Sequence, residues 1–342
     1  MRENVKYYQE DNYAQLVRTV DLKKDFTNND FVYVDELAYD FLWRVQLKEP
    51  NIILPNIGAN IGEKYYVSPE DLPKEKNVLG PNAILLRSKC NDTHFVYFRL
   101  STSSYDNEMK KLVGASGQPK FNKTDLKKVR LFMPSLKEQK KISHFLGLLE
   151  ERIATQNKII DKLQSLIKGI GKQLFMDNQN WRTVKIGELL RIGNGKDYKH
   201  LCIGKIPVYG TGGQMLLVND YLYDGESVCI GRKGTIDTPM FLKGKFWTVD
   251  TLFYTYDFKD VLPKFCYYLF LQINWKLYNE GTGVPSLSKS TIENIKVKIP
   301  SLEQQQKICS ILDCYEHKTN NEEQILELYH SEKQYLLRQT FI

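Results

Sequence analysis

Residues 129–142 read VRLFMPSLKEQKKI, and residues 295–308 read IKVKIPSLEQQQKI. The two stretches lie 166 positions apart, and the same offset aligns residues from about 115 to 176 with the segment that reaches the last residue. Gly117 meets Gly283 in this alignment, which contains no gap. Chance does not keep a single offset over about sixty residues, so the pattern indicates an internal duplication.

Each copy predicts a short strand followed by a long helix. An alternation of apolar residues stops at Pro134 or Pro300, and the serine that follows has a Glu or Gln three residues later. This spacing fits a capping box, in which the two side chains satisfy free backbone N–H groups at the start of a helix. We therefore expect long helices over residues 135–177 and 301–342.

The first predicted helix carries apolar residues in alternating steps of four and three, interrupted at Gln156. That spacing is the heptad seam of a coiled coil, which needs a second helix to cover it. Residues 135–180 have a net charge of +3 and residues 301–342 a net charge of −3, which favours pairing of the two helices. The alternative is two unrelated amphipathic helices, each packed on its own domain. The predicted seam residues are Ile142, Leu146, Leu149, Ile153, Ile160, Leu163 and Ile167 in the first helix, and Leu312, Leu326 and Tyr329 in the second.

A segment rich in Tyr, Phe, Val, Ile and Gly precedes each predicted helix. Within these segments, ILPNIGANIG (53–62) resembles SVCIGRKGTI (227–236), and both are typical of a strand, a glycine turn and a second strand. A chain of 342 residues is also too long for one core. We predict an α+β fold: two globular mixed α/β domains, residues 1–134 and 178–300, separated by the two long helices in a pseudo-two-fold repeat.

Composition and motifs exclude several classes of function. The net charge of +7 is compatible with binding to a polyanion such as nucleic acid but does not establish such binding. The cysteines and histidines show no metal-ligand spacing, so we expect reduced thiols, a cytoplasmic protein and no metal. The N-terminus has no apolar core, and no run approaches about 18 apolar residues, so neither a signal peptide nor a membrane span is expected. No P-loop, dinucleotide fingerprint or Asn/Asp-Pro-Pro-Tyr/Phe motif is present, and no catalytic residue is assigned.

Taken together, these phrases make nearly the whole chain resemble the specificity (S) subunit of a Type I restriction–modification system. The strongest marks are GASGQPKFNKTDLKKVRLFMPSLKEQKKI (114–142) and GTGVPSLSKSTIENIKVKIPSLEQQQKI (281–308). The stretches WRTVKIGELLRIGNGK (181–196) and IPVYGTGG (206–213) are typical of how a target-recognition domain begins and continues.

The resemblance implies two target-recognition domains, each of which reads one half of a bipartite sequence in double-stranded DNA. The long helices would pack as an antiparallel coiled coil and set the distance between the half-sites. Methyltransferase (M) and restriction (R) subunits would be the partners, with S-adenosylmethionine expected in the former and ATP in the latter. This chain would need no cofactor and would be non-catalytic. The family's opening strand, represented by Trp181 and KIGELL in the second domain, has no counterpart at the chain start, so the first domain is expected to lack it.

Base reading needs donors and acceptors that reach the groove edges, and phosphate contacts come from Lys, Arg and backbone N–H groups. Glycine-punctuated loops supply such groups and permit close backbone approach. The predicted DNA-binding residues are Lys196, Tyr198, Lys199, His200, Thr211, Arg232, Lys233 and Ser286 in the second domain, and Asn56, Asn60, Lys64 and Lys120 in the first. The alternative for each is an ordinary solvated turn. For the whole chain, the alternative is a coiled-coil adaptor or assembly protein with degenerate or half-site DNA recognition.

Overall fold

The computed structural model describes residues 5–58, 60–113, 120–176 and 180–341, and the chain divides into two compact units. Unit 1 comprises Met1–Asn157 and Ile325–Ile342, and unit 2 comprises Lys158–Gln324. The two long helices are α6 (Leu136–Met176) and α10 (Leu302–Thr340). Each of them therefore contributes one part to unit 1 and another to unit 2.

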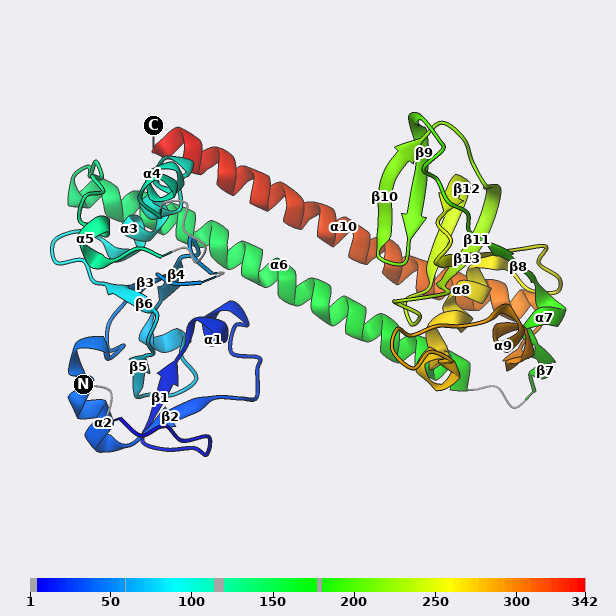
Figure 1. Cartoon of the computed structure of the whole chain (residues 1–342), viewed down its shortest axis with the longest axis horizontal. Coiled ribbons are helices and arrows are strands. Elements are labelled where there is room, and N and C mark those ends of the chain that lie inside the picture. The colour runs from blue at the N-terminus through cyan, green and yellow to red at the C-terminus, as the bar shows by residue number, and fades with distance from the viewer. Residues whose placement is uncertain (1–4, 59, 114–119, 177–179, 342) are drawn as a thin grey trace. The chain divides into compact units, whose positions relative to one another are not determined.

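Unit 1 contains two three-stranded sheets and several short helices (Figure 1). The first sheet has the order β2-β1-β5, with β1 antiparallel to β2 and parallel to β5. The second has the order β4-β3-β6 and is antiparallel throughout. The strands are β1 (Ala14–Val17), β2 (Val32–Val34), β3 (Asn51–Pro55), β4 (Tyr65–Val67), β5 (Asn77–Leu79) and β6 (Ala83–Leu86). The helices besides α6 and α10 are α1 (Thr19–Lys23), α2 (Glu36–Phe41), η1 (Trp43–Val45), η2 (Pro69–Asp71), α3 (Thr93–Leu100), α4 (Ser103–Val113) and α5 (Lys123–Leu126).

Unit 2 is built on a six-stranded sheet with the order β10-β9-β12-β11-β13-β8, in which only the pairing of β12 with β9 is parallel. A separate two-stranded sheet joins β14 to β7. The strands are β7 (Arg182–Lys185), β8 (Arg191–Asn194), β9 (Ile203–Gly210), β10 (Gly213–Val218), β11 (Tyr223–Gly231), β12 (Met240–Thr248), β13 (Leu252–Tyr256) and β14 (Lys296–Ile299). The helices are α7 (Ile186–Leu189), α8 (Pro263–Gln272), η3 (Trp275–Tyr278) and α9 (Lys289–Asn294).

The long helices α6 and α10 pack together in antiparallel fashion. In unit 1, Leu146 of α6 shares a buried cluster with Leu337 of α10, and Lys333 Nζ lies 2.5 Å from Glu150 Oε1. In unit 2, the end of α6 shares a core with the beginning of α10, where Leu312 is buried. The predicted pairing of two long helices is confirmed. All ten predicted seam residues are buried or half-buried.

The duplicated glutamines Gln139 and Gln305 show why the repeat retains its sequence at the start of each helix. Both are buried, and each donates its side-chain N–H to the carbonyl of the preceding Pro134 or Pro300, at 2.9 and 3.1 Å. Each side-chain oxygen also accepts a backbone N–H at the start of α3 or α8, at 3.0 and 2.8 Å. A buried amide with these partners ties each long helix to the globular fold beside it.

The strand predicted in the first copy is absent, and that prediction is wrong. Residues 129–135 form no regular element, although Lys296–Ile299 in the second copy form β14. The difference is tertiary: β14 is a strand because it pairs with β7, and the described residues of unit 1 hold no strand in the place of β7. An isolated strand cannot satisfy its backbone groups, so alternation alone does not produce one.

Candidate nucleic-acid interface

The loop between β12 and β13 holds several predicted DNA-binding segments of unit 2 together through backbone hydrogen bonds. Lys196 donates its N–H to the Thr248 carbonyl at 2.8 Å. Arg232 donates its N–H to the Thr251 carbonyl, also at 2.8 Å. In the same loop, Val249 donates to the end of β9 at 3.0 Å. Lys196 and Arg232 are 36 residues apart in sequence, and both are thus anchored to the end of β12 and the short loop that follows it.

Gly195 makes the approach of its loop to this anchor possible. A Cβ at position 195 would lie 1.8 Å from the Val249 carbonyl oxygen and 2.7 Å from that of Leu252. Both oxygens belong to the backbone, so a larger residue at position 195 would have to push the two loops apart. The glycine in the sequence GNGK is therefore required by packing, and it holds Lys196 beside the loop that also anchors Arg232.

Three cations line one cavity of about 450 Å³ in unit 2, and they are Arg232, Lys233 and Lys289. Ser286 forms an isolated bridge with Lys233 and lines the same cavity, and Asn194 at the end of β8 adds an amide. The described residues that line the cavity include no carboxylate. The cavity therefore combines positive potential with neutral donors and acceptors, which suits phosphate oxygens and base edges.

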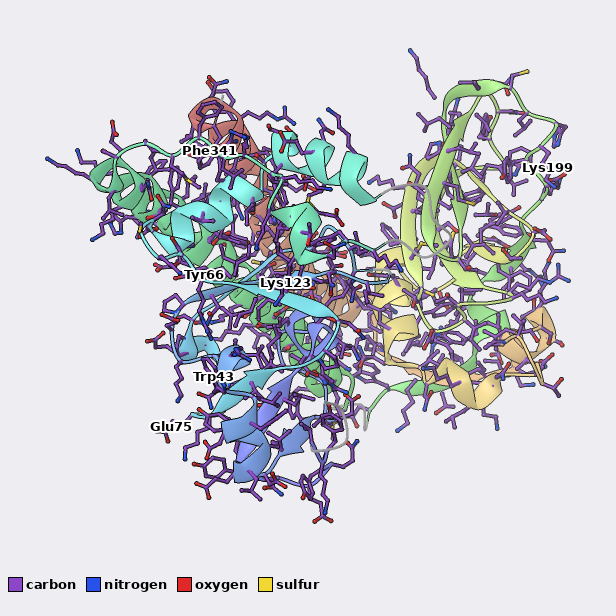
Figure 2. All side chains as sticks on the ribbon, turned by 60° about the vertical axis from the view of Figure 1, so that its left-hand side comes forward. Trp43, Tyr66, Glu75, Lys123, Lys199 and Phe341 are labelled. Carbon is purple, nitrogen blue, oxygen red and sulfur yellow. The ribbon has the colours of Figure 1, made fainter. Side chains whose placement is uncertain are left out.

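The remaining predicted residues of unit 2 lie around this cavity or apart from it. Thr211, in the turn between β9 and β10, has its hydroxyl 3.7 Å from where a Cβ at Gly234 would lie, which places it beside the Arg232 loop. Tyr198, Lys199 and His200 lie between β8 and β9 and do not line the cavity. Lys199 is exposed on this loop (Figure 2). Tyr198 packs against the core of the sheet, and the His200 ring lies edge-on to Trp247 at 5.8 Å.

Unit 1 has a backbone bridge equivalent to the one between Lys233 and Ser286, but with different side chains around it. Ile57 and Lys120 form an isolated bridge, as Lys233 and Ser286 do in unit 2, and Lys120 lies 166 positions before Ser286. Asn56 donates its amide to a backbone carbonyl at 3.2 Å. Its side-chain oxygen is buried and has no hydrogen-bond partner within the part of the chain that the structure describes. Asn56 and Ile57 thus stand where unit 2 has Arg232 and Lys233, and Lys120 stands where unit 2 has Ser286.

Two predicted residues of unit 1 are engaged with their own chain. Lys64 Nζ lies 2.5 Å from Asp106 Oδ1, and its side chain is only 11% exposed. Asn60 accepts a hydrogen bond from Lys23 Nζ at 3.3 Å. A lysine that is already paired and largely buried offers little free charge to a phosphate, so the geometry argues against Lys64 as a contact.

Sequence reasoning missed Asn194 and Lys289 as residues of the candidate site. Lys289 is the first residue of α9, whose preceding Ser288 accepts the backbone N–H of Thr291 at 3.2 Å. The repeat held a signal for it, because Lys289 aligns with Lys123, the first residue of α5 in unit 1 (Figure 2). Asn194 lies in GNGK, the glycine-punctuated stretch that also holds the predicted residue Lys196, but its approach to Arg232 comes from the folding of the sheet.

The described residues contain no group of three or more His, Cys, Asp or Glu side chains arranged to hold a metal ion. Among the same residues, none of the helices has both the length and the apolar character needed to cross a membrane.

The family model of the Type I restriction modification DNA specificity domain matches the chain twice, over residues 7–165 and 178–328. The chain therefore belongs to this family. Each match covers one globular segment and most of the long helix that follows it.

Curated relatives and a solved structure agree with this assignment. The putative type I restriction enzyme MjaX specificity subunit of Methanocaldococcus jannaschii is 25% identical over 350 residues, which cover 86% of this chain and 79% of the relative. The type I restriction enzyme MjaVIII specificity subunit of the same organism is 23% identical over 336 residues, which cover 82% of this chain and 76% of that relative. A Type-I restriction-modification system S subunit from M. genitalium has a similar fold, with a TM-score of 0.60 and 19% identity over 87% of this chain and 84% of that one.

Proposed function

We propose that this chain is the sequence-specific DNA-recognition subunit of a type I restriction–modification complex. The observation that carries the proposal is the double match to the specificity-domain family, with one match for each half of an internally duplicated chain. The cation-lined cavity of unit 2 supports it, because Arg232, Lys233 and Lys289 converge there without a carboxylate. Unit 1 would read one half of a bipartite target and unit 2 the other.

The chain's own groups would bind and discriminate DNA, and partner subunits would supply the chemistry. Arg232 and Lys233 offer donors for guanine edges or phosphates. Asn56 would first have to leave its own chain, because its amide donates to the Phe121 carbonyl and its side-chain oxygen is buried. Methyl transfer would belong to methyltransferase subunits that bind S-adenosylmethionine, and ATP-driven cleavage to restriction subunits. The paired helices α6 and α10 would set the span between half-sites and bind the methyltransferases. We propose a cytoplasmic location on the same grounds.

A binding experiment tests this proposal directly. The purified chain, with and without a type I methyltransferase subunit from the same host, is titrated with duplexes that carry or lack candidate bipartite sequences. We expect specific binding to a split site, with an affinity that falls steeply as salt is added, because phosphate contacts release condensed counterions. A footprint that is contiguous, or equal binding to every duplex in the presence of the methyltransferase, would contradict the proposal.

Two observations favour a second candidate function, that of a coiled-coil adaptor with degenerate or half-site recognition. Unit 1 has no strand in the place of β7 among its described residues, and Lys64 is paired with Asp106. An adaptor would assemble partners through α6 and α10 without reading two half-sites. A gel shift with random duplex at low salt separates the two functions, because the adaptor predicts no shift with or without the methyltransferase.

A further inference from the structure

The candidate site of unit 2 is built where two antiparallel strands, β11 and β13, pair with each other. Gly231 at the end of β11 faces Leu252 at the start of β13, and Arg232 comes directly after β11. The backbone N–H of Arg232 donates to the Thr251 carbonyl at 2.8 Å, and the Arg232 carbonyl accepts the N–H of Leu287 at 2.9 Å. Strand pairing and two hydrogen bonds thus fix the place of Arg232.

Unit 1 has the same construction on β3 and β6. Pro55 at the end of β3 faces Ala83 at the start of β6, and Asn56 comes directly after β3. The backbone N–H of Asn56 donates to the Asn82 carbonyl at 3.2 Å, and the Asn56 carbonyl accepts the N–H of Phe121, also at 3.2 Å. Phe121 lies 166 positions before the residue that makes the same contact in unit 2. Asn82 in unit 1 is therefore equivalent to the residue just before β13 in unit 2.

Asn82 is the asparagine of this place that can contact another molecule. The Asn56 side chain serves its own chain, because it donates to the Phe121 carbonyl at 3.2 Å and its oxygen is buried. Asn82 is exposed, and none of the hydrogen bonds among the described residues involves its side chain. Its amide donor and its amide acceptor are therefore both available to a ligand.

The backbone of Asn82 limits which residues can replace it. Its φ is 68°, in the left-handed region that asparagine, aspartate and glycine tolerate better than other residues do. A substitution by aspartate or glycine therefore changes the side chain without straining the backbone at the start of β6.

Two lysines give the surroundings of Asn82 a positive potential. Lys120 and Lys123 are exposed, and both align at the 166-residue offset with residues that line the cavity of unit 2. Neither lysine forms an ion pair within the part of the chain that the structure describes. Asp125, the carboxylate nearest to them in sequence, is paired with Lys128 at 3.1 Å. Unpaired cations and a neutral amide thus occur together here, as they do in unit 2.

We propose that Asn82 is a specificity-determining residue of unit 1 and reads an adenine in one half-site, while Lys120 and Lys123 contact phosphates beside it. This inference rests on the proposed function and adds a reading residue that sequence reasoning missed. An asparagine amide donates to N7 of adenine and accepts from its N6 amino group, a pattern that distinguishes adenine from the other bases in the major groove. Lysines at phosphates position the duplex but carry no sequence information.

Selection from a library of random duplexes tests this assignment. The full-length protein is mixed with the library together with a type I methyltransferase subunit from the same host, and the bound duplexes are sequenced. We expect the wild type to select a bipartite sequence with an adenine that depends on Asn82. Asn82→Gly should reduce the preference for that adenine about tenfold or more. Asn82→Asp should shift the preference there towards cytosine, because a carboxylate accepts the cytosine amino group.

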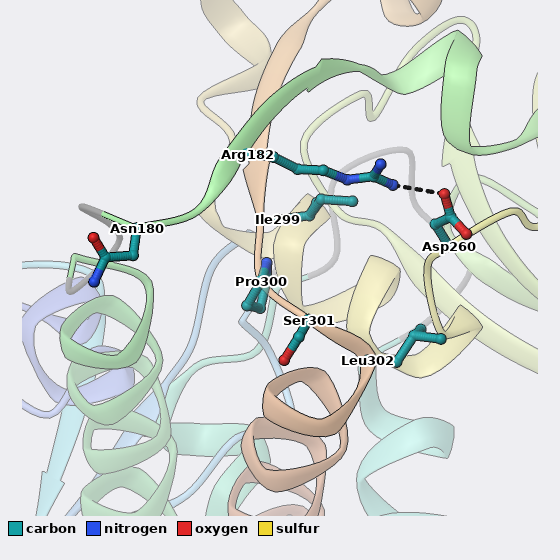
Figure 3. Close-up of a pocket in the computed structure, with 7 residues that line it drawn as sticks. All are labelled: Asn180, Arg182, Asp260, Ile299, Pro300, Ser301 and Leu302. Carbon is teal, nitrogen blue, oxygen red and sulfur yellow. Dashed lines mark hydrogen bonds and ion pairs between the residues drawn. The ribbon is translucent and has the colours of Figure 1, made fainter.

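Three controls separate reading from charge, phosphate contact and folding. Asn180→Asp adds the same charge at an exposed asparagine of unit 2, which lines a different cavity of about 430 Å³ beside Arg182 and Pro300 (Figure 3). It should leave the preference at every position unchanged. Lys123→Ala should weaken binding to all duplexes alike and reduce the dependence on salt. Circular dichroism checks that each variant is folded.

The outcomes distinguish this inference from the proposed function. If the wild type selects a bipartite sequence and the Asn82 variants leave every preference unchanged, the inference is wrong and the proposed function stands. A change in both half-sites, or at a base other than adenine, would also overturn the inference. If the wild type selects no sequence at all, the proposed function fails and the inference fails with it.

Discussion

The internal repeat is visible in the contacts of single residues at equivalent positions of the two copies. Glu150 and Glu316 lie 166 positions apart and make equivalent contacts, Glu150 with the ring of His94 on α3 at 3.4 Å and Glu316 with Lys264 on α8 at 2.6 Å. The partner is a histidine in unit 1 and a lysine in unit 2, whereas the glutamate is the same in both units. The contact between a long helix and its adjacent globular helix is therefore older than the divergence of the two units.

The Glu150 carboxylate makes the stability of unit 1 depend on pH. Burial alone would raise the pKa of Glu150, but the hydrogen bond from His94 and the charge of Lys333 outweigh it, and the pKa is lowered. In the unfolded chain the pKa is about 4.3. The stabilisation is therefore complete above that value and is lost as the pH falls through the lowered, folded-state pKa.

We expect Glu150→Gln to destabilise the protein by about 1–2 kcal/mol at pH 7, between the values typical of exposed and buried ion pairs. The difference between wild type and variant should be smaller at an acidic pH below the lowered folded-state pKa, where the wild-type carboxylate is protonated as well. Urea unfolding at both pH values measures it. Glu332→Gln, at an exposed position of α10 in the same unit, is the control. A difference that stays constant between the two pH values would contradict the assigned ion pair.

Arg232 is the residue whose replacement should affect DNA recognition most clearly. We expect Arg232→Ala to weaken binding to one half-site by about 1–3 kcal/mol if the guanidinium contacts a base. Competition binding with duplexes that carry base changes in either half-site measures this. Arg182→Ala, which removes an arginine of the same unit that lines a different cavity, is the matched control. An equal loss on every sequence would assign Arg232 to a phosphate instead.

At the scale of elements, the long helices depend on each other. Leu163 on α6 is 8% exposed and belongs to the predicted seam, whereas Leu166, three residues later on the same helix, is 45% exposed. Neither helix buries its seam by itself, because a single helix has only one apolar face and gains stability by packing that face. Figure 1 shows α10 beside α6 in each unit.

This dependence predicts different effects of the same substitution at the two leucines. Leu163→Asp should destabilise the protein by about 3 kcal/mol or more and abolish assembly with the methyltransferase, because it buries an unpaired carboxylate and removes apolar contacts. Leu166→Asp should cost less than about 0.5 kcal/mol. Thermal unfolding and co-purification with the methyltransferase measure both effects. Intact assembly of Leu163→Asp would show that the seam is assigned wrongly.

At the scale of the whole molecule, the two copies share their long helices but differ in the residues of their candidate DNA-binding surfaces. Both copies have a long helix whose buried glutamine, Gln139 or Gln305, is hydrogen-bonded to the adjacent globular fold. The cavity of unit 2, however, holds Arg232 and Lys233 where unit 1 has Asn56 and Ile57. Duplication followed by divergence of the loops explains this contrast, since loops tolerate change that packed helices do not.

Two reading surfaces of this kind should act independently. We expect Lys120→Ala to weaken binding to duplexes through one half-site and Arg232→Ala through the other, with losses that add in the double variant, because the two residues belong to different units. Binding to duplexes in which either half-site is scrambled measures the effect. If both variants respond to scrambling of the same half-site, the division of reading between the units is wrong.

The sequence by itself determined the duplication, the two long helices and their pairing. These features are local or periodic: a capping box marks a helix start, a heptad marks its seam, and one offset relates the copies. Which polar residues lie close together could be seen only in the tertiary structure. Asn194, Arg232 and Lys289 converge on one cavity because strand pairing joins distant segments, and Lys64 is neutralised by Asp106, 42 residues away. The missing strand at residues 129–133 has the same cause, since a strand exists only where another chain segment accepts and donates its hydrogen bonds.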